Sequence, residues 1–127
     1  MRFIPDLIRK RFIPDETNVI FKVFQQNYPT KPTMVDVGAC KGDALIQFLN
    51  HNWSVHAFEP KESNYNELVD NTIGSQITIN NKAVSNEPKE KTTFFSSNQI
   101  DGIGSLMKFS DFHDNTELTT VTTLEIY

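Results

Sequence analysis

Cysteine, glycine and long hydrophobic runs are scarce in this chain. Among its 127 residues there is one cysteine, and only five are glycine. A single cysteine cannot form an internal disulfide, so we expect a reducing compartment and predict a cytoplasmic location. Residues 1–11 alternate between apolar and charged types and never reach the length of a signal-sequence core or of a membrane span. We therefore expect no transmembrane segment.

An excess of charge of one sign is also missing. The net charge is −4 and both signs are interspersed, so no basic footprint for nucleic acid is visible and no nucleic-acid partner is expected. What the chain does have is aromatic residues, including ten phenylalanines. This content favours a packed core over a disordered tail, and the length suits one domain.

The sequence predicts an N-terminal helical segment over residues 1–29. A short motif occurs twice, as Arg2–Asp6 and Arg11–Asp15, and in each copy proline and aspartate favour a helix start. The second helix is predicted from about Asp15 to Asn27. Its apolar face is expected to hold Val19, Ile20, Val23 and Phe24.

Residues 30–127 are predicted to form an α/β domain that begins with alternating strands and helices. The expected strands are 33–37, 54–58 and a third around Ile77 and Ile79, which 83–85 continues into a turn. The expected helices are 42–50 and 62–71, the second with a capping box at Asn64 and Glu67. This alternation is typical of a parallel βαβ sheet.

After Pro88 the pattern changes to strands without helices. Residues 92–95 and 118–127 have β-rich character and are separated by a polar loop from 96 to about 116. We expect an antiparallel hairpin added to the parallel sheet. The sequence ends inside the predicted last strand, so a truncated or unusually short domain is expected. Its uncovered strand edge predicts a homodimer.

The sequence VDVGACKGD at residues 35–43 lies at the predicted junction of the first strand and its helix. A glycine turn and a helix N-terminus at this junction suit a nucleotide-type cofactor. Glu59 follows Gly42 by 17 positions, at the predicted end of the second strand, where a carboxylate can accept two ribose hydroxyls. Because Cys40 replaces the second glycine of G-x-G-x-x-G, an NAD-dependent oxidoreductase is the less favoured alternative.

Five motifs in order carry a family resemblance: VDVGACKGD, VHAFEPKESNYNELVDN, INNKAVSN, the GSL of Gly104–Leu106, and VTTLEIY. Together they resemble the FkbM-like methyltransferases. The resemblance implies a Rossmann-like methyltransferase fold, S-adenosylmethionine as cofactor, and O-methyl transfer to a small-molecule or glycan hydroxyl. Family members continue with a helix and a Lys-Ile-Asp-x-Glu-Gly-like strand that this sequence does not contain. A non-catalytic cofactor-binding or dimerising fragment is therefore the alternative.

The resemblance and the spacing together give a set of expected cofactor-binding residues. Asp36 would position the cofactor's ammonium group or a bridging water, although it could also only stabilise the turn. Glu59 would bind the ribose, although an acid that merely starts a helix fits the same place. The full set is Asp36, Gly38, Ala39, Gly42, Asp43, Glu59, Pro60, Asn81, Ala83, Val84 and Ser105. Ala83 and Val84 would line the adenine.

Nucleophilic and metal-based chemistry are less favoured. Cys40 lies at a predicted helix start, but no His or Asn partner motif accompanies it, and methyl transfer needs no covalent enzyme intermediate. Asp111, His113, Asp114 and Glu117 fit no metal-site spacing, and His56 suits a core position. We assign no metal site, no catalytic residue and no general base.

Overall fold

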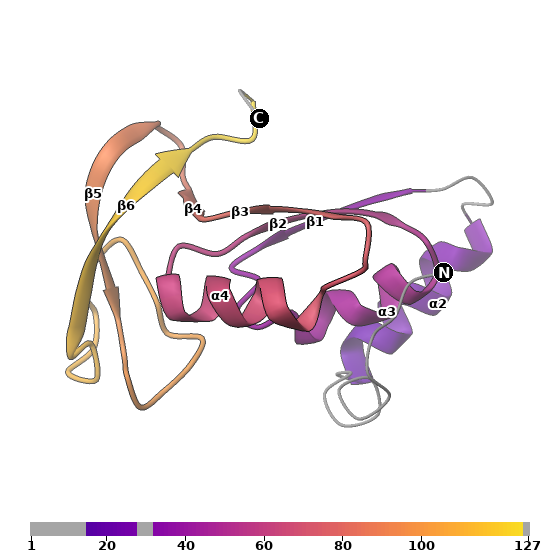
Figure 1. Ribbon diagram of the computed structural model, residues 1–127, viewed down its shortest axis with the longest axis horizontal. Helices are drawn as coiled ribbons and strands as arrows, with labels where there is room; N and C mark the ends of the chain where they lie inside the picture. The colour runs from indigo at the N-terminus through magenta and orange to yellow at the C-terminus, as the bar shows by residue number, and fades with distance from the viewer. Residues whose placement is uncertain (1–14, 28–31, 126–127) are drawn as a thin grey trace.

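The computed structural model describes residues 15–27 and 32–125. The first copy of the repeated motif and the predicted helix start in it lie outside these ranges. The elements in chain order are α2 (Asp15–Asn27), β1 (Thr33–Val37), the 3-10 turn η1 (Asp43–Leu45), α3 (Ile46–Asn50), β2 (Ser54–Phe58), α4 (Glu62–Asn71), β3 (Ile77–Asn80), β4 (Lys82–Val84), β5 (Lys89–Ser96) and β6 (Asn115–Thr122). Figure 1 shows their arrangement.

The first sheet confirms the predicted parallel βαβ arrangement. Its strand order is β1-β2-β3, and both pairs are parallel, with Val35 opposite His56 and Ala57 opposite Ile79. Figure 1 shows α2, α3 and α4 on the same face of this sheet. The core lies between them and includes Leu45, Ile46, Phe48, Leu49, Trp53, Val55, Ala57 and Leu68. The helix predicted over 42–50 forms as η1 followed by the shorter α3, and its apolar side chains face this core.

The opposite face of β1 carries no helix in the described part of the chain. Val35 and Val37 are 46% and 51% exposed, whereas Met34 packs against the core. Successive residues of a strand point to opposite faces, so one side of β1 is buried and the other faces outward.

The apolar face predicted for α2 is wrong. Val19, Ile20, Val23 and Phe24 are 42–62% exposed, while Phe21 is 2% exposed. The Phe21 ring lies 5.5 Å from that of Phe48 and 5.8 Å from that of Trp53. The buried face of α2 is therefore the one that carries Phe21, which joins an aromatic cluster with Phe48 and Trp53.

The capping box predicted for α4 is also wrong. The helix begins at Glu62, and Asn64 is buried and donates a hydrogen bond to Cys40 Sγ at 3.4 Å. The Glu62 backbone N–H donates instead to Glu117 Oε1 at 2.7 Å. A carboxylate on β6 therefore supplies the helix-end acceptor that sequence spacing assigned to residues within the helix.

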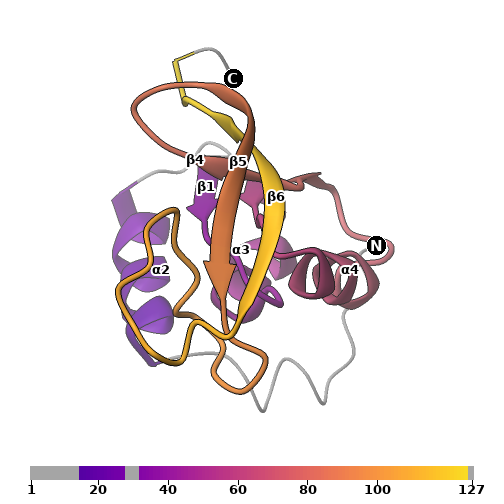
Figure 2. The same ribbon diagram turned by 90° about the vertical axis from the view of Figure 1, so that its left-hand side faces the viewer.

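The second sheet has the order β4-β6-β5. The predicted antiparallel hairpin is confirmed, since β5 and β6 pair antiparallel with Phe94 opposite Glu117. Figure 2 shows these two strands as a twisted ribbon. The hairpin does not extend the first sheet, however. It forms a separate sheet with β4, which follows β3 after Asn81 alone and pairs parallel with β6.

The position of β6 differs from the expectation that the last strand lies at an uncovered edge of the sheet. β6 ends at Thr122 and lies between β5, which pairs along most of its length, and β4, which pairs with it only at residues 120–122. β6 is therefore the middle strand of its sheet and not the edge strand that was expected, while the homodimer itself stays a prediction. The predicted strand 118–127 is shorter in the structure, because β6 ends at Thr122 and residues 124 and 125 form a turn; residues 126 and 127 lie outside the described ranges.

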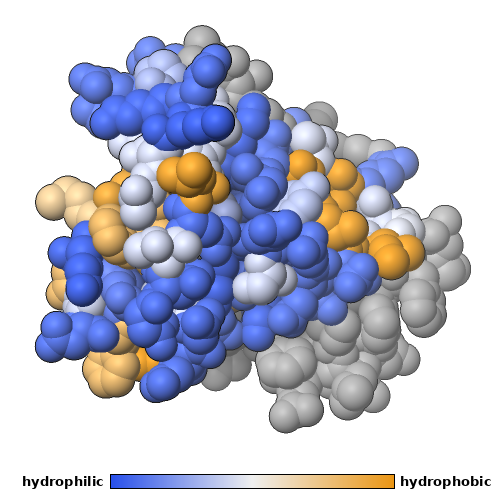
Figure 3. Space-filling view, turned by 60° about the vertical axis from the view of Figure 1, so that its left-hand side comes forward, coloured by the Kyte–Doolittle hydropathy of each residue, from blue (hydrophilic) through white to orange (hydrophobic). Residues whose placement is uncertain are grey.

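One face of the molecule is mostly polar (Figure 3). Figure 3 shows polar side chains over most of one face, with apolar ones gathered in separate groups. The exposed apolar side chains include Met107, Phe109 and Phe112 of the connection between β5 and β6. Within residues 15–27 and 32–125, no helix has the length and apolar character needed to cross a bilayer.

Candidate functional site

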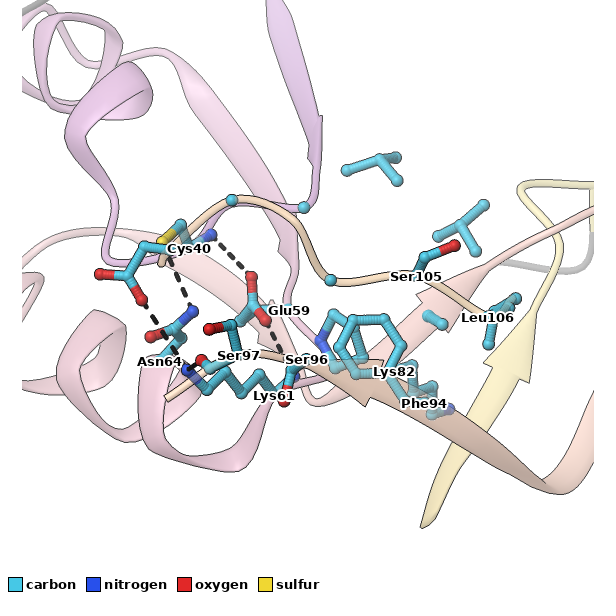
Figure 4. A pocket seen from close by; sticks show the side chains of 18 of the residues that line it. Cys40, Glu59, Lys61, Asn64, Lys82, Phe94, Ser96, Ser97, Ser105 and Leu106 are labelled. Atoms are coloured by element: carbon cyan, nitrogen blue, oxygen red, sulfur yellow. Dashed lines mark hydrogen bonds and ion pairs between the residues drawn. The ribbon is translucent and has the colours of Figure 1, made fainter. Parts of the chain in front are cut away.

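A cavity of about 450 Å³ lies where the carboxyl ends of β1 and β2 meet β4, β5 and the connection after β5. Its size is in the range of sites for small molecules. Figure 4 shows that its labelled residues fall toward two ends. The end beside β1 and β2 carries Cys40, Glu59, Lys61 and Asn64. The end beside β4 and β5 carries Lys82, Phe94, Ser105 and Leu106.

Glu59 is the central charged residue of the first end. It follows β2 directly and is only 5% exposed. One of its carboxylate oxygens accepts the Cys40 backbone N–H at 2.7 Å, and the other accepts the Lys61 backbone N–H at 2.8 Å. Burial raises the pKa of Glu59 in spite of these two bonds and of the nearby Lys61 charge. The structure thus fixes a desolvated carboxylate at the cavity wall.

Two left-handed residues shape the turn above Glu59. Gly38 has φ +79° and Cys40 has φ +52°. The backbone N–H groups of Gly38 and Ala39 both donate to the Phe58 carbonyl, at 2.9 and 3.0 Å. A Cβ on Gly38 would have no atom within 4 Å, and Gly38 lines the cavity. This turn therefore holds backbone against open space, as close approach of a ligand requires.

Asp101 and two lysines connect the β5–β6 connection to this end. Asp101 lies 2.9 Å from Lys41 Nζ and 3.8 Å from Lys61 Nζ. Lys61 Nζ also donates to the Ser97 carbonyl at 2.7 Å. Lys41 holds the pKa of Asp101 below its ordinary value, with Lys61 adding to the effect. These contacts hold the connection across the cavity.

The second end is built mainly by β4, β5 and residues 104–107. Ala83 and Phe94 are each 6% exposed, and both line the cavity. Gly104 lies so close to the Phe94 ring that a Cβ there would contact its Cε1 at 2.8 Å. Ser105 pairs with Phe95 through two backbone hydrogen bonds of 2.8 and 2.9 Å, which fix the Gly104–Leu106 segment beside β5.

The structure brings part of the predicted cofactor set together. Gly38, Glu59, Pro60, Ala83, Val84 and Ser105 all line the cavity. Asp36, Ala39, Gly42, Asp43 and Asn81 are not among the lining residues. The site prediction therefore divides into residues at the cavity and residues that support it from behind.

Three of the predicted residues that do not line the cavity are Asp36, Asp43 and Asn81. Burial raises the pKa of Asp36, and its Oδ2 atom has no hydrogen-bond partner in the part of the chain that is described. Burial likewise raises the pKa of Asp43. Asn81 Nδ2 donates to the carbonyls of Glu59 and Pro60, at 2.9 and 3.4 Å. Asn81 therefore holds the Glu59 loop in place.

Sequence reasoning did not include several lining residues, among them Lys61, Asn64, Lys82, Phe94 and Asp101. Lys61 had a local signal, since it lies two positions after Glu59 in the same loop. No local sequence signal pointed to Phe94 and Asp101, because they reach the cavity through the separate second sheet and its long connection.

The geometry does not support the nucleophilic and metal-based chemistry that the sequence analysis disfavoured. Burial raises the pKa of the Cys40 thiol, with the charges of Asp101 and Glu59 adding to it, so a thiolate is disfavoured. His113 is buried, and its Nε2 bonds to the Ile103 carbonyl. Over the two described ranges, no three His, Cys, Asp or Glu side chains form a group that could hold a metal ion.

Comparison of this chain with models of known protein families, with curated proteins and with solved structures found no match.

Proposed function

We propose that this chain binds S-adenosylmethionine in the cavity, with Glu59 accepting the two ribose hydroxyls. One observation carries the proposal: a buried carboxylate at the end of the second parallel strand, with both oxygens fixed by backbone N–H groups, lines a cavity of suitable size. A carboxylate at the end of this strand is the usual ribose-binding group of nucleotide folds. Each oxygen has lone-pair capacity for a further hydrogen bond.

The surrounding residues fit the other parts of such a ligand. Gly38 presents backbone to open space at the first turn, where a ligand can approach closely. Ala83 and Val84 offer small apolar surfaces on the far side, suited to the flat adenine. The order of the five family-like motifs along the sequence supports the same assignment.

The proposed reaction is methyl transfer to a hydroxyl of a small molecule or glycan. The cofactor would supply an activated methyl group on a sulfonium. The contribution of the protein is alignment of that methyl with the acceptor oxygen. We assign no general base in this chain. Cytoplasmic location remains part of the proposal, based on the single cysteine.

Calorimetric titration with S-adenosylhomocysteine and with NAD tests the proposal. We expect S-adenosylhomocysteine to bind and NAD to bind much more weakly. Glu59→Gln should reduce the affinity for S-adenosylhomocysteine about tenfold or more, since charged hydrogen bonds are worth about 1.5–3 kcal/mol each. Glu16→Gln, an exposed change on α2, is the matched control and should change nothing.

Two results would contradict the assignment. Equal or tighter binding of NAD would favour a nicotinamide-dependent oxidoreductase. Unchanged affinity for S-adenosylhomocysteine in the Glu59→Gln variant would reduce Glu59 to a structural acid. Because a glutamine cannot accept both the Cys40 and Lys61 N–H groups, thermal unfolding of each variant must be recorded beside the titration.

A further inference from the structure

The charges on the cavity wall are unevenly compensated. The charged lining side chains are Glu59, Lys61, Lys82 and Asp101. Glu59 is held by two backbone N–H groups, and Lys61 and Asp101 lie 3.8 Å apart. The Lys82 side chain, at the solvent-exposed start of β4, forms no ion pair or hydrogen bond with any residue in the described ranges. A cation without a counter-charge is therefore left beside the second end.

Three serine hydroxyls that line the cavity have a hydrogen that no residue accepts within the described ranges. Ser96 Oγ accepts from Asn115 Nδ2 at 3.1 Å, and Ser105 Oγ accepts from the Met107 N–H at 3.1 Å. Ser97 Oγ accepts from two backbone N–H groups, each at 3.0 Å. Within residues 15–27 and 32–125 none of these hydroxyls donates a hydrogen bond. Each can therefore donate its own hydrogen to a ligand. Figure 4 places Ser105 at the second end, whereas Ser96 and Ser97 lie beside Glu59 and Lys61, and the Ser97 carbonyl accepts from Lys61 Nζ.

The remaining wall of this end is apolar. Phe94 lies behind it and is 6% exposed, and Leu106 and Met107 line the cavity beside the ring. Hydrogen-bond donors set in an apolar wall favour a ligand that combines an apolar body with an acceptor group. Among acceptor groups, an anionic one would bind most tightly, because charge-assisted hydrogen bonds are stronger than neutral ones.

We infer that the second end of the cavity binds an apolar or aromatic acid, whose carboxylate or phosphate pairs with Lys82 and the Ser105 hydroxyl. The inference rests on the proposed function in one respect: it assigns this acid to the methyl acceptor, with the cofactor at the Glu59 end. It narrows the acceptor class from hydroxyl compounds in general to hydroxylated acids. The Lys82 ammonium group is a specificity-determining group in this scheme.

Ligand-observed NMR titration of the full chain with benzoate, phenyl phosphate and benzamide tests the inference, in the presence of saturating S-adenosylhomocysteine. Benzamide has the shape of benzoate without its charge. We expect at least one of the two anions to bind about fivefold more tightly than benzamide, the upper end for a partly exposed ion pair. Lys82→Gln should remove most of this advantage. Lys91→Gln, an exposed change on β5 outside the cavity, should preserve it.

Several outcomes would overturn the inference. Equal binding of all three probes would do so, as would failure of both anions to bind at about 20 mM, or an anion advantage that survives in Lys82→Gln. Displacement of S-adenosylhomocysteine by the anion would place the acid in the cofactor subsite and contradict the acceptor assignment. Failure of the proposed function is distinguishable, because it would appear in the S-adenosylhomocysteine titration and its Glu59 dependence and leave the difference between benzoate and benzamide intact.

Discussion

Gly38 and Gly74 form a natural pair for testing whether a ligand approaches the turn after β1. Their φ angles are +79° and +80°, and a Cβ on either residue would have no atom within 4 Å. Alanine at each position therefore incurs the same left-handed backbone penalty, about 1–2 kcal/mol, and no clash. Gly38 lines the cavity and Gly74, beyond the end of α4, does not.

The two variants should thus differ in binding and agree in stability. We expect Gly38→Ala and Gly74→Ala to lower the free energy of unfolding in urea by amounts that agree within about 0.5 kcal/mol. Only Gly38→Ala should weaken S-adenosylhomocysteine binding, by about tenfold, because an added methyl against a close-packed ligand costs about 1–3 kcal/mol. Equal affinities measured by calorimetry would refute close approach of the ligand to Gly38.

Three further predictions concern the same region. Gly42→Ala should cost more stability than Gly74→Ala in urea unfolding, because its φ is +97° and its Cβ would lie 2.8 Å from Leu68 Cδ1; equal losses would mean that Leu68 moves aside freely. Alkylation of Cys40 by iodoacetamide, followed by mass spectrometry, should need a pH above that for an ordinary thiol and should slow when S-adenosylhomocysteine is bound; a ligand without protective effect would contradict its placement. Asp101 stabilises the fold above its ordinary pKa, and this contribution is lost as pH falls through its lowered pKa; carboxyl NMR should show that pKa rising in Lys41→Gln, and an unchanged value would disprove the pairing.

Local periodicity was sufficient for the parallel half of the fold. Strands 33–37 and 54–58 were predicted with the bounds that β1 and β2 have, because short segments with apolar residues between turn residues leave few alternatives. The Glu59 position followed from the same pattern, since the end of a strand places the next residue at the edge of the sheet. Both inferences use only residues that are close in sequence, and this information was enough to place the two strands and Glu59.

Contacts distant in sequence account for the errors. The orientation of α2 depends on the aromatic cluster that Phe21 forms with Phe48 and Trp53, and the capping of α4 depends on Glu117, which lies 55 residues away from the N–H it accepts. The second end of the cavity requires β5 and its connection to form a separate sheet. Neither propensity nor spacing encodes which sheet a hairpin joins, because both describe neighbours along the chain.

The raised pKa of Glu59 leads to a last prediction, on pH. A carboxyl whose pKa is raised by folding stabilises the protein below the ordinary pKa of glutamate, and this contribution is lost as pH rises through the folded pKa. Near neutral pH the fold therefore holds this carboxylate at a cost in stability, which is typical of functional sites. Hydroxyl groups donating to the carboxylate favour its ionised form, so a bound ligand should lower the pKa of Glu59.

By linkage, the affinity for S-adenosylhomocysteine should then increase as pH rises through the Glu59 pKa of the free protein. Calorimetric titrations from about pH 4.5 to 7, compared between the wild type and Glu59→Gln, measure this increase and subtract the titration of the ligand itself. The variant should show a flatter profile than the wild type. Parallel profiles would mean that the ligand does not contact this carboxylate, and the ribose assignment would then be wrong even if S-adenosylhomocysteine binds.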